Sequence, residues 1–129
     1  MIWRFLTVEN IIALQAEQID LYGGSHGLRD FGLLESAVSR AKNKVNYEPD
    51  ATVPQVAASL SWGLVKNHAF IDGNKRIGLV SLIVFLGANG YRSVKSPMEE
   101  SAMVLRAAAS EITEDEWTAW VERSVAPLA

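Results

Sequence analysis

One segment decides how the rest of this chain is interpreted, and it is His68-Ala69-Phe70-Ile71-Asp72-Gly73-Asn74-Lys75-Arg76. It lies between two apolar stretches that each show helical periodicity. Within a few residues it combines an imidazole, a carboxylate, an amide, a glycine and two cations. The sequence therefore predicts a short loop that carries reactive side chains and joins two buried helices.

The second half of this loop is suited to bind phosphate. Gly73 can adopt a positive φ at little cost, and such turns direct backbone N–H groups towards an anion. The helix that follows has free N–H groups and a positive dipole end at the same place. Lys75 and Arg76 add two cations there, although cations oppose the helix dipole at an N-terminus. A bound phosphate would offset this unfavourable charge.

The first half of the loop supplies groups for proton transfer and metal binding. The imidazole of His68 can accept a proton from a hydroxyl. Asp72 offers the hard oxygen ligand that Mg²⁺ prefers when it is shared with phosphates. Phe70 is expected to anchor the loop in the core. Asn74 is expected either to fix the loop geometry or to bind a phosphate.

Each of these residues also has an ordinary structural explanation. A single histidine at a helix end is usually a cap, Asp-Gly-Asn is a common turn, and Lys-Arg is usually a solvated pair. Their occurrence together and in this order favours a functional site over these separate explanations.

Outward from the loop, apolar residues spaced by threes and fours predict about six helices. Their expected ranges are Leu6–Leu21, Gly32–Asn46, Pro54–Asn67, Lys75–Ala88, Pro97–Ser110 and Thr113–Ser124. Thr7 is a predicted N-cap, Gly23 a predicted stop, and Ser96–Glu99 and Thr113–Glu116 have the spacing of capping boxes. Tyr91–Lys95 is expected to be short and extended, and no alternating run predicts a confident strand.

Length and composition are consistent with one compact all-α domain over residues 1–129. The chain is 49% hydrophobic and 21% charged, which is ordinary for a globular protein. It has no cysteine, which excludes disulfides, thiolate nucleophiles and cysteine-ligated zinc. The sequence shows no internal repeat or low-complexity linker.

Charge and hydropathy limit the partners. The net charge of −3 and the pI of about 5.3 argue against direct binding of nucleic acid, which usually needs a basic surface. The most apolar stretch, Ile77–Ala88, is too short to cross a bilayer, which needs roughly 20 residues. No signal peptide is recognised at the N-terminus. We therefore expect a cytoplasmic protein that does not bind a membrane.

The loop resembles the signature of the Fic/Doc superfamily, His-Pro-Phe-x-(Asp/Glu)-Gly-Asn-Gly-Arg-x-x-Arg. The matching positions are His68, Phe70, Asp72, Gly73, Asn74 and Arg76. Ala69 replaces the proline, Lys75 replaces the last glycine, and Leu79 stands in place of the final arginine. These departures are similar to the death-on-curing (Doc) toxin branch, whose pattern is His-x-Phe-x-Asp-x-Asn-Lys-Arg. The segment Tyr22–Val38 also resembles the N-terminal part of Doc-like proteins.

The resemblance implies a fold and a reaction. The superfamily fold is a compact helical bundle with this loop between two central helices. Most Fic proteins transfer AMP from ATP to a protein hydroxyl. Doc-type toxins transfer the γ-phosphate of ATP to a threonine of translation elongation factor Tu, which blocks translation, and a cognate antitoxin neutralises them.

The same resemblance assigns roles to residues of this chain. It implies His68 as the base, Asp72 as the ligand of Mg²⁺, and Lys75 and Arg76 as catalytic cations. The expected ATP-binding residues are Phe70, Gly73, Asn74, Lys75 and Arg76. Lys75 fills the space that glycine leaves for the phosphates in the AMP-transferring pattern, and Leu79 removes a phosphate clamp. We therefore expect a serine/threonine phosphotransferase that uses ATP and Mg²⁺.

Many superfamily members carry an inhibitory segment of the pattern Ser/Thr-x-x-x-Glu-Gly/Asn. Neither Ser96–Glu100 nor Ser110–Glu114 is followed by the required glycine or asparagine. We therefore expect inhibition in trans by an antitoxin helix laid along an apolar groove. Two alternatives stay open: an AMP-transferring enzyme, and a non-catalytic binding module that acts as a co-regulator.

Residues outside the loop have mostly structural explanations. His26 is expected to face solvent, and Arg29 with Asp30 to form a structural pair or a loop cap, with contact to a partner as the weaker alternative. Trp117 and Trp120 are expected in the core. Trp62 is expected to pack beneath the loop.

Overall fold

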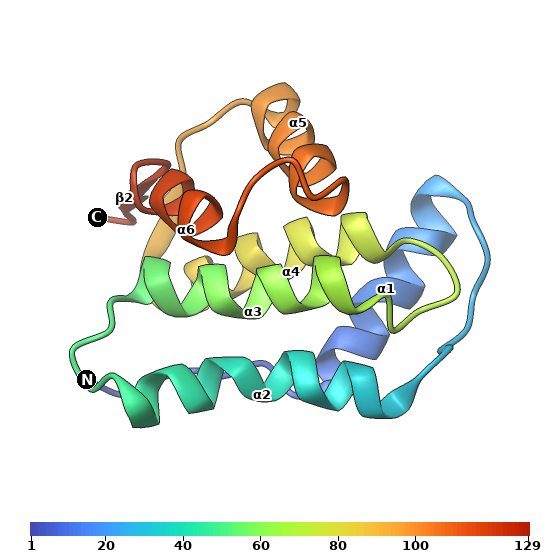
Figure 1. Ribbon diagram of the computed structural model, residues 1–129, viewed down its shortest axis with the longest axis horizontal. Coiled ribbons are helices and arrows are strands. Elements are labelled where there is room, and N and C mark those ends of the chain that lie inside the picture. The colour runs from blue at the N-terminus through green and yellow to red at the C-terminus, as the bar shows by residue number, and fades with distance from the viewer.

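Two helices, α3 (Val53–Asn67) and α4 (Asn74–Ala88), form the centre of the fold in this computed structural model, which describes residues 1–129. α3 is buried along most of its length because its residues are small or apolar. In Figure 1, α2 lies on one side of α3, while α5 and α6 lie on the other. α1 packs against α4. The other helices are α1 (Val8–Tyr22), α2 (Phe31–Tyr47), α5 (Pro97–Ala108) and α6 (Glu114–Glu122).

The predicted all-α fold is confirmed, and the predicted helix bounds lie within two residues of the observed ones. The third helix begins at Val53, one residue before Pro54. The fifth helix ends at Ala108 because Ser110 adopts a left-handed φ of 60°. None of the helices is long and apolar enough to cross a membrane.

Side-chain caps begin five of the six helices. The capping side chains belong to Thr7, Asp30, Thr52, Ser96 and Thr113. The capping box predicted at Thr113–Glu116 is present, but the one predicted at Ser96–Glu99 is only half formed. The Glu99 carboxylate instead accepts a hydrogen bond from Trp120 Nε1 at 2.9 Å, because α6 packs beside it. α4 is the exception, since no side chain caps its start at Gly73.

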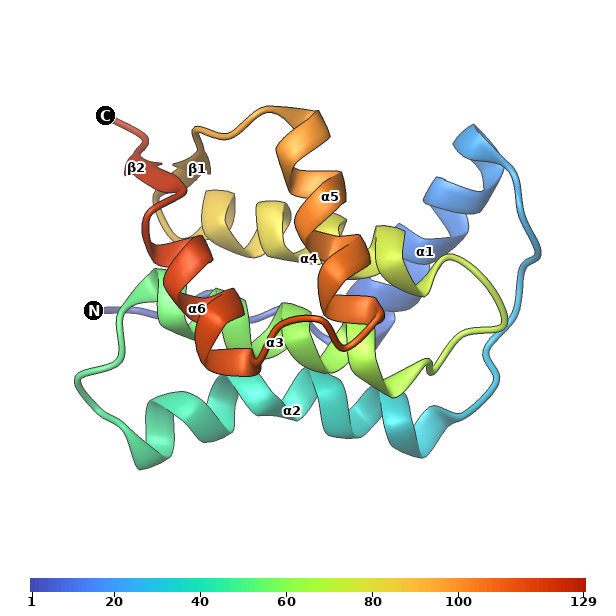
Figure 2. The same cartoon turned by 45° about the horizontal axis from the view of Figure 1, so that its top comes forward.

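A two-stranded sheet closes one end of the molecule and was not predicted. β1 (Tyr91–Ser93) pairs antiparallel with β2 (Val125–Pro127), with Arg92 opposite Ala126 (Figure 2). The sequence indicated an extended segment at Tyr91–Lys95 but gave no sign of its partner. Strands of three residues are too short to show alternation, and the pairing joins distant parts of the chain.

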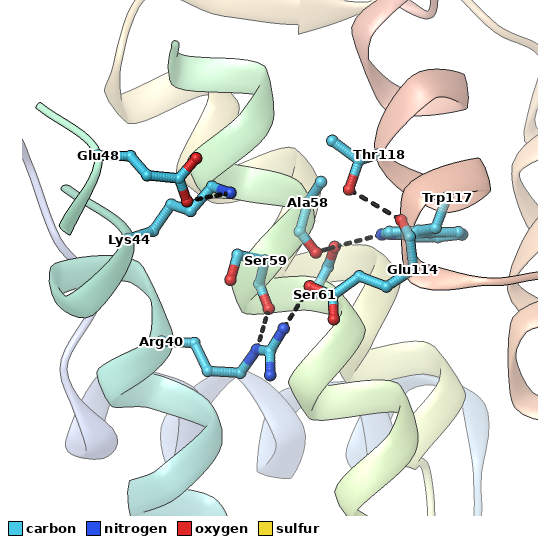
Figure 3. A network of polar contacts seen from close by, with 9 residues as sticks. All are labelled: Arg40, Lys44, Glu48, Ala58, Ser59, Ser61, Glu114, Trp117 and Thr118. Carbon is cyan, nitrogen blue, oxygen red and sulfur yellow. Dashed lines mark hydrogen bonds and ion pairs between the residues drawn. The ribbon is translucent and has the colours of Figure 1, made fainter. Parts of the chain in front are cut away.

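Polar contacts join α2 and α6 to α3 (Figure 3). Arg40 on α2 donates from Nε to the carbonyl of Ser59 at 2.7 Å and also pairs with the carboxylate of Glu114. Trp117 is fully buried, and its Nε1 donates to Ser61 Oγ at 3.0 Å. The predicted core position of the two tryptophans is confirmed, because Trp120 is also buried and its ring centroid lies 5.2 Å from that of Trp117.

The close approach of α3 and α4 depends on Gly78. A Cβ atom at this position would lie 2.3 Å from Cγ2 of Val65, a fully buried and rotationally stiff side chain. Gly87 lies on the same helix, and a Cβ atom there would meet nothing within 4 Å. Both glycines therefore lie on α4, but only Gly78 is packed against another helix.

We predict that Gly78→Ala destabilises the protein by about 1–3 kcal/mol, because it overpacks the contact between the central helices. Gly87→Ala is the matched control and should raise the stability by roughly 0.5–1 kcal/mol, because alanine favours the helix. Urea unfolding of both variants measures the two changes. Equal stability of the two variants would contradict this account of the crossing.

Candidate functional site

The loop between α3 and α4 lies at the end of the molecule opposite both chain termini (Figures 1 and 2). It forms the wall of an open cavity of about 400 Å³. The lining residues are His68, Ile71, Asp72, Gly73, Asn74, Lys75 and Arg76. The structure therefore brings together every predicted site residue except Phe70.

Phe70 and Asn74 give the loop its shape. Phe70 is buried in the core, as expected, so its side chain does not line the cavity. Its N–H donates to Asn74 Oδ1 at 3.0 Å, and Asn74 Nδ2 donates to its carbonyl at 2.9 Å. Of the two roles expected for Asn74, the structure shows the one in which it fixes the loop geometry.

A second loop, the connection from α1 to α2, holds the first one in place. Its residues Gly27–Asp30 run beside Ala69–Ile71, with an antiparallel bridge between Leu28 and Phe70. The carbonyl of Ala69 accepts the N–H groups of Arg29 at 2.8 Å and Asp30 at 3.0 Å. The N–H of Ile71 donates to the carbonyl of Gly27 at 3.0 Å. The sequence did not indicate this pairing, because it joins residues far apart in the chain.

His68 stands at the exposed end of α3 in a left-handed conformation, with φ 50° and ψ 48°. Arg29 donates from Nε to the carbonyl of His68 at 2.8 Å, and its Nη2 reaches the same oxygen. Asp30 caps α2 through Oδ1 and the N–H of Leu33, at 2.9 Å. Both residues are therefore caps, as one of the two expectations stated, but each caps a different helix.

Asp72 is the residue that contributes a carboxylate to the cavity. The N–H of Ser25 donates to its Oδ2 at 3.1 Å, and the N–H of Gly73 donates to its Oδ1 at 2.7 Å. These two hydrogen bonds hold the pKa of Asp72 below its ordinary value of 3.8. Desolvation opposes them, and the charges of Arg76 and Lys75 lower the pKa further by smaller amounts. The carboxylate is therefore ionised at neutral pH.

The start of α4 carries two cations, and no side chain caps it. Gly73 adopts a φ of 74°, and the first turn carries the exposed Lys75 and the half-buried Arg76. Arg76 Nη1 donates to the carbonyl of Gln18 at 3.3 Å, which leaves its other donors near the cavity. Gly24 packs against this group, since a Cβ atom there would lie 2.7 Å from Asp72 Oδ2 and 3.0 Å from Arg76 Nη2. Free N–H groups, a helix dipole and two cations together favour an anion.

The residues of the cavity fit a metal ion only when a ligand shares it. No group of three or more histidine, aspartate or glutamate side chains is placed to hold a metal. Asp72 is the one carboxylate in the cavity. Mg²⁺ is commonly held by one or two carboxylates together with substrate phosphates and water, so a single aspartate suits that mode.

His26 is exposed and lies 2.8 Å from Asp20, as expected for a residue facing solvent. Leu79 lies one turn further along α4 and lines a smaller, mostly apolar cavity of about 180 Å³ between α4 and α5. Trp62 packs against the core, and Lys66 Nζ lies 5.5 Å from the centre of its ring.

Comparisons with known proteins agree with this arrangement. A model of the Fic/DOC family matches residues 5–86. "Protein kinase doc" of Escherichia phage P1 is 34% identical over 110 residues, which cover 85% of this chain and 86% of that protein. "Toxin Doc" of Mycolicibacterium smegmatis is 43% identical over 74 residues, which cover 55% of each chain. The matched family segment contains the whole of the loop and both central helices up to Leu86.

The depressed pKa of Asp72 gives a prediction about pH. Its hydrogen bonds to Ser25 and Gly73 should contribute fully above pH 3.8 and be lost as the pH falls through the lowered pKa. The amide chemical shifts of Ser25 and Gly73, followed by NMR, should therefore titrate with a midpoint below 3.8. Asp72→Asn should abolish this titration. A midpoint at or above 3.8 in the unchanged protein would contradict the assignment.

A second prediction concerns the contact between Asn74 and Phe70. Asn74→Ala should destabilise the protein by about 1–3 kcal/mol, because it leaves the buried N–H and carbonyl of Phe70 without partners. Asn43→Ala, an exposed change on α2, is the control and should have little effect. Thermal unfolding at neutral pH compares them. Unchanged stability of the Asn74 variant would show that the loop holds its shape without this contact.

Proposed function

Because the chain belongs to the Fic/DOC family, on its Doc toxin branch, we propose that it is the toxin of a toxin–antitoxin pair and a protein kinase. It transfers the γ-phosphate of ATP to a protein hydroxyl, with a threonine of translation elongation factor Tu as the target, and so blocks translation in the cytoplasm. The names of the two relatives, a protein kinase and a toxin, support both parts of this proposal.

One observation carries the proposal: a single cavity presents His68, the ionised Asp72 and two cations around a helix N-terminus without a cap. Phosphoryl transfer needs little covalent chemistry from the protein, and its catalysis rests on positioning and charge stabilisation. The first turn of α4 is suited to hold the phosphates. His68 lies at the exposed rim, where a hydroxyl of another protein can reach it.

In the proposed reaction, His68 accepts the proton of the target hydroxyl. The hydroxyl oxygen forms a bond to the γ-phosphorus, and the bond from that phosphorus to the bridging oxygen of the β-phosphate breaks. ADP leaves with the electron pair of that bond. Lys75, Arg76 and the free N–H groups of α4 stabilise the negative charge on the phosphates throughout.

Asp72 is the residue that would hold Mg²⁺. When bound, the ion would supply positive charge next to the phosphates. The two backbone hydrogen bonds of Asp72 fix the position of its carboxylate, and they leave each oxygen with a further lone pair. Phe70 and Asn74 act indirectly, since they fix the loop that carries Gly73 and Asp72.

Two residues favour transfer of phosphate over transfer of AMP. Lys75 occupies the position at which the AMP-transferring pattern has glycine, and its exposed side chain lines the cavity. Leu79 stands where that pattern has a second arginine, and it faces a mostly apolar cavity instead. The added charge of Lys75 and the absence of an arginine at position 79 both change how the phosphates of ATP are held.

A cognate antitoxin is the second partner in this proposal. The sequence lacks the inhibitory segment that many relatives carry, so no part of this chain is expected to block the cavity. The antitoxin would therefore act in trans and would not need a direct contact with nucleic acid from this chain.

We predict that the protein labels elongation factor Tu with γ-labelled ATP and Mg²⁺, and that mass spectrometry finds a phosphate-sized gain. His68→Ala should lower the rate by about 10²–10⁴-fold, because the base is lost. His26→Ala is the matched control and should retain the rate, since His26 is exposed and bonded to Asp20 outside the cavity. Label transfer from α-labelled ATP alone, with an AMP-sized gain, would overturn the proposal.

Expression in bacteria gives an independent test. The unchanged protein should arrest growth, His68→Ala should not, and co-expression of the antitoxin should restore growth to cells that carry the unchanged protein. Growth arrest by the His68→Ala variant would favour a non-catalytic binding mechanism instead.

A further inference from the structure

The guanidinium of Arg29 lies at the C-terminal end of α3, against the backbone carbonyl of His68, the residue proposed as the base. Its Nε donates to the carbonyl of His68 at 2.8 Å, its Nη2 reaches the same carbonyl, and Nη2 also lies 3.4 Å from the carbonyl of Asn67. Neither carbonyl accepts a backbone N–H group, because the chain leaves the helix at this point. One side chain from a distant loop therefore bonds to the last carbonyl of α3 and to the carbonyl that follows it.

The backbone of His68 needs such support. It has a φ of 50°, in the left-handed region that residues with a side chain adopt only rarely. This conformation directs the chain from α3 into the loop, and it sets the direction in which the imidazole leaves the backbone. A residue held in a sparsely populated region persists only where neighbouring groups fix it. In this chain Arg29 is the side chain that bonds to the backbone of His68 itself.

The side chain and the backbone of Arg29 contact different residues. The N–H groups of Arg29 and Asp30 bind the carbonyl of Ala69, and any residue at position 29 other than proline would keep that contact. The side chain alone reaches His68 and Asn67. Removal of the side chain therefore leaves the two loops paired and affects the end of α3 specifically.

We propose that Arg29 is a positioning residue, which acts through His68 and holds its imidazole in the orientation needed to accept a proton from the target. This inference rests on the proposed phosphoryl transfer. Arg29 lies outside the set of residues that line the cavity, so it does not bind the phosphates. Its loss should impair the chemical step and leave the binding of ATP intact.

The kinetic test uses Arg29→Ala and Arg29→Lys with ATP and elongation factor Tu. We expect kcat to fall by about 10- to 100-fold in Arg29→Ala, the size of effect expected when a catalytic group is displaced by about 1 Å. KM for ATP should not change, because Gly73, Lys75 and Arg76 keep their positions. Arg29→Lys should recover part of kcat, since a lysine can donate to one of the two carbonyls but lacks the fork of donors.

Arg40→Ala is the matched control. Arg40 also donates from Nε to a carbonyl of α3, that of Ser59 at 2.7 Å, but in the body of the helix and away from the loop (Figure 3). Both alanine variants should lower the thermal stability. If Arg29 acts only on stability, the two variants will have equal kcat values at a temperature where both are folded.

A measurement that needs no activity separates this inference from the proposed function. Backbone chemical shifts and scalar couplings of His68 report its φ, and they should leave the left-handed range in Arg29→Ala but not in Arg40→Ala. If the unchanged protein transfers no phosphate, the proposed function fails, and the role of Arg29 is then decided by this comparison. An unchanged φ of His68, an unchanged kcat in folded Arg29→Ala, or a raised KM for ATP with unchanged kcat would each overturn the proposal. If Arg29→Ala does not fold, Arg29→Lys is judged by the same three readouts.

Discussion

The pairing of Gly27–Asp30 with Ala69–Ile71 is the constraint on which the site depends. The loop between α3 and α4 has only six residues, and it must reverse the chain, bury Phe70 and present the cavity residues together. Its own contact, between Asn74 and the backbone of Phe70, fixes the turn but not its position relative to the rest of the molecule. The three backbone hydrogen bonds from the second loop fix that position. Through them, α1 and α2 become part of the site although they contribute no side chain to the cavity lining.

The sequence predicted the features that depend on residues close together in the chain. Caps at Thr7 and Thr113, the apolar faces of the helices and the chemical character of the loop are all local, so the sequence shows them directly. The pairing of β1 with β2 and the hydrogen bond from Arg29 to His68 join residues far apart. A single sequence does not indicate such contacts, because their formation depends on how the helices pack.

The same distinction explains the individual differences from prediction. Glu99 has the spacing of a capping box but binds Trp120, because α6 packs against the start of α5 and offers a donor that the local sequence does not reveal. Phe70 belongs to the same motif as the cavity residues, and position in a motif does not tell whether a side chain faces a ligand or the core. Its burial and the contact with Asn74 assign it to the core side of the loop.

The two helix ends that meet at the loop have opposite polarity, and only one of them is bonded by a side chain of the protein. The C-terminal end of α3 carries free carbonyls and a partial negative charge, and the guanidinium of Arg29 binds the carbonyls of Asn67 and His68 there. The N-terminal end of α4 carries free N–H groups and a partial positive charge, and it receives no side-chain cap and two further cations. Neutralisation of one end keeps His68 in a fixed conformation without a ligand. At the other end, two cations and free N–H groups lie beside the single carboxylate of Asp72, so this part of the molecule favours an anion, as a reaction on phosphate requires.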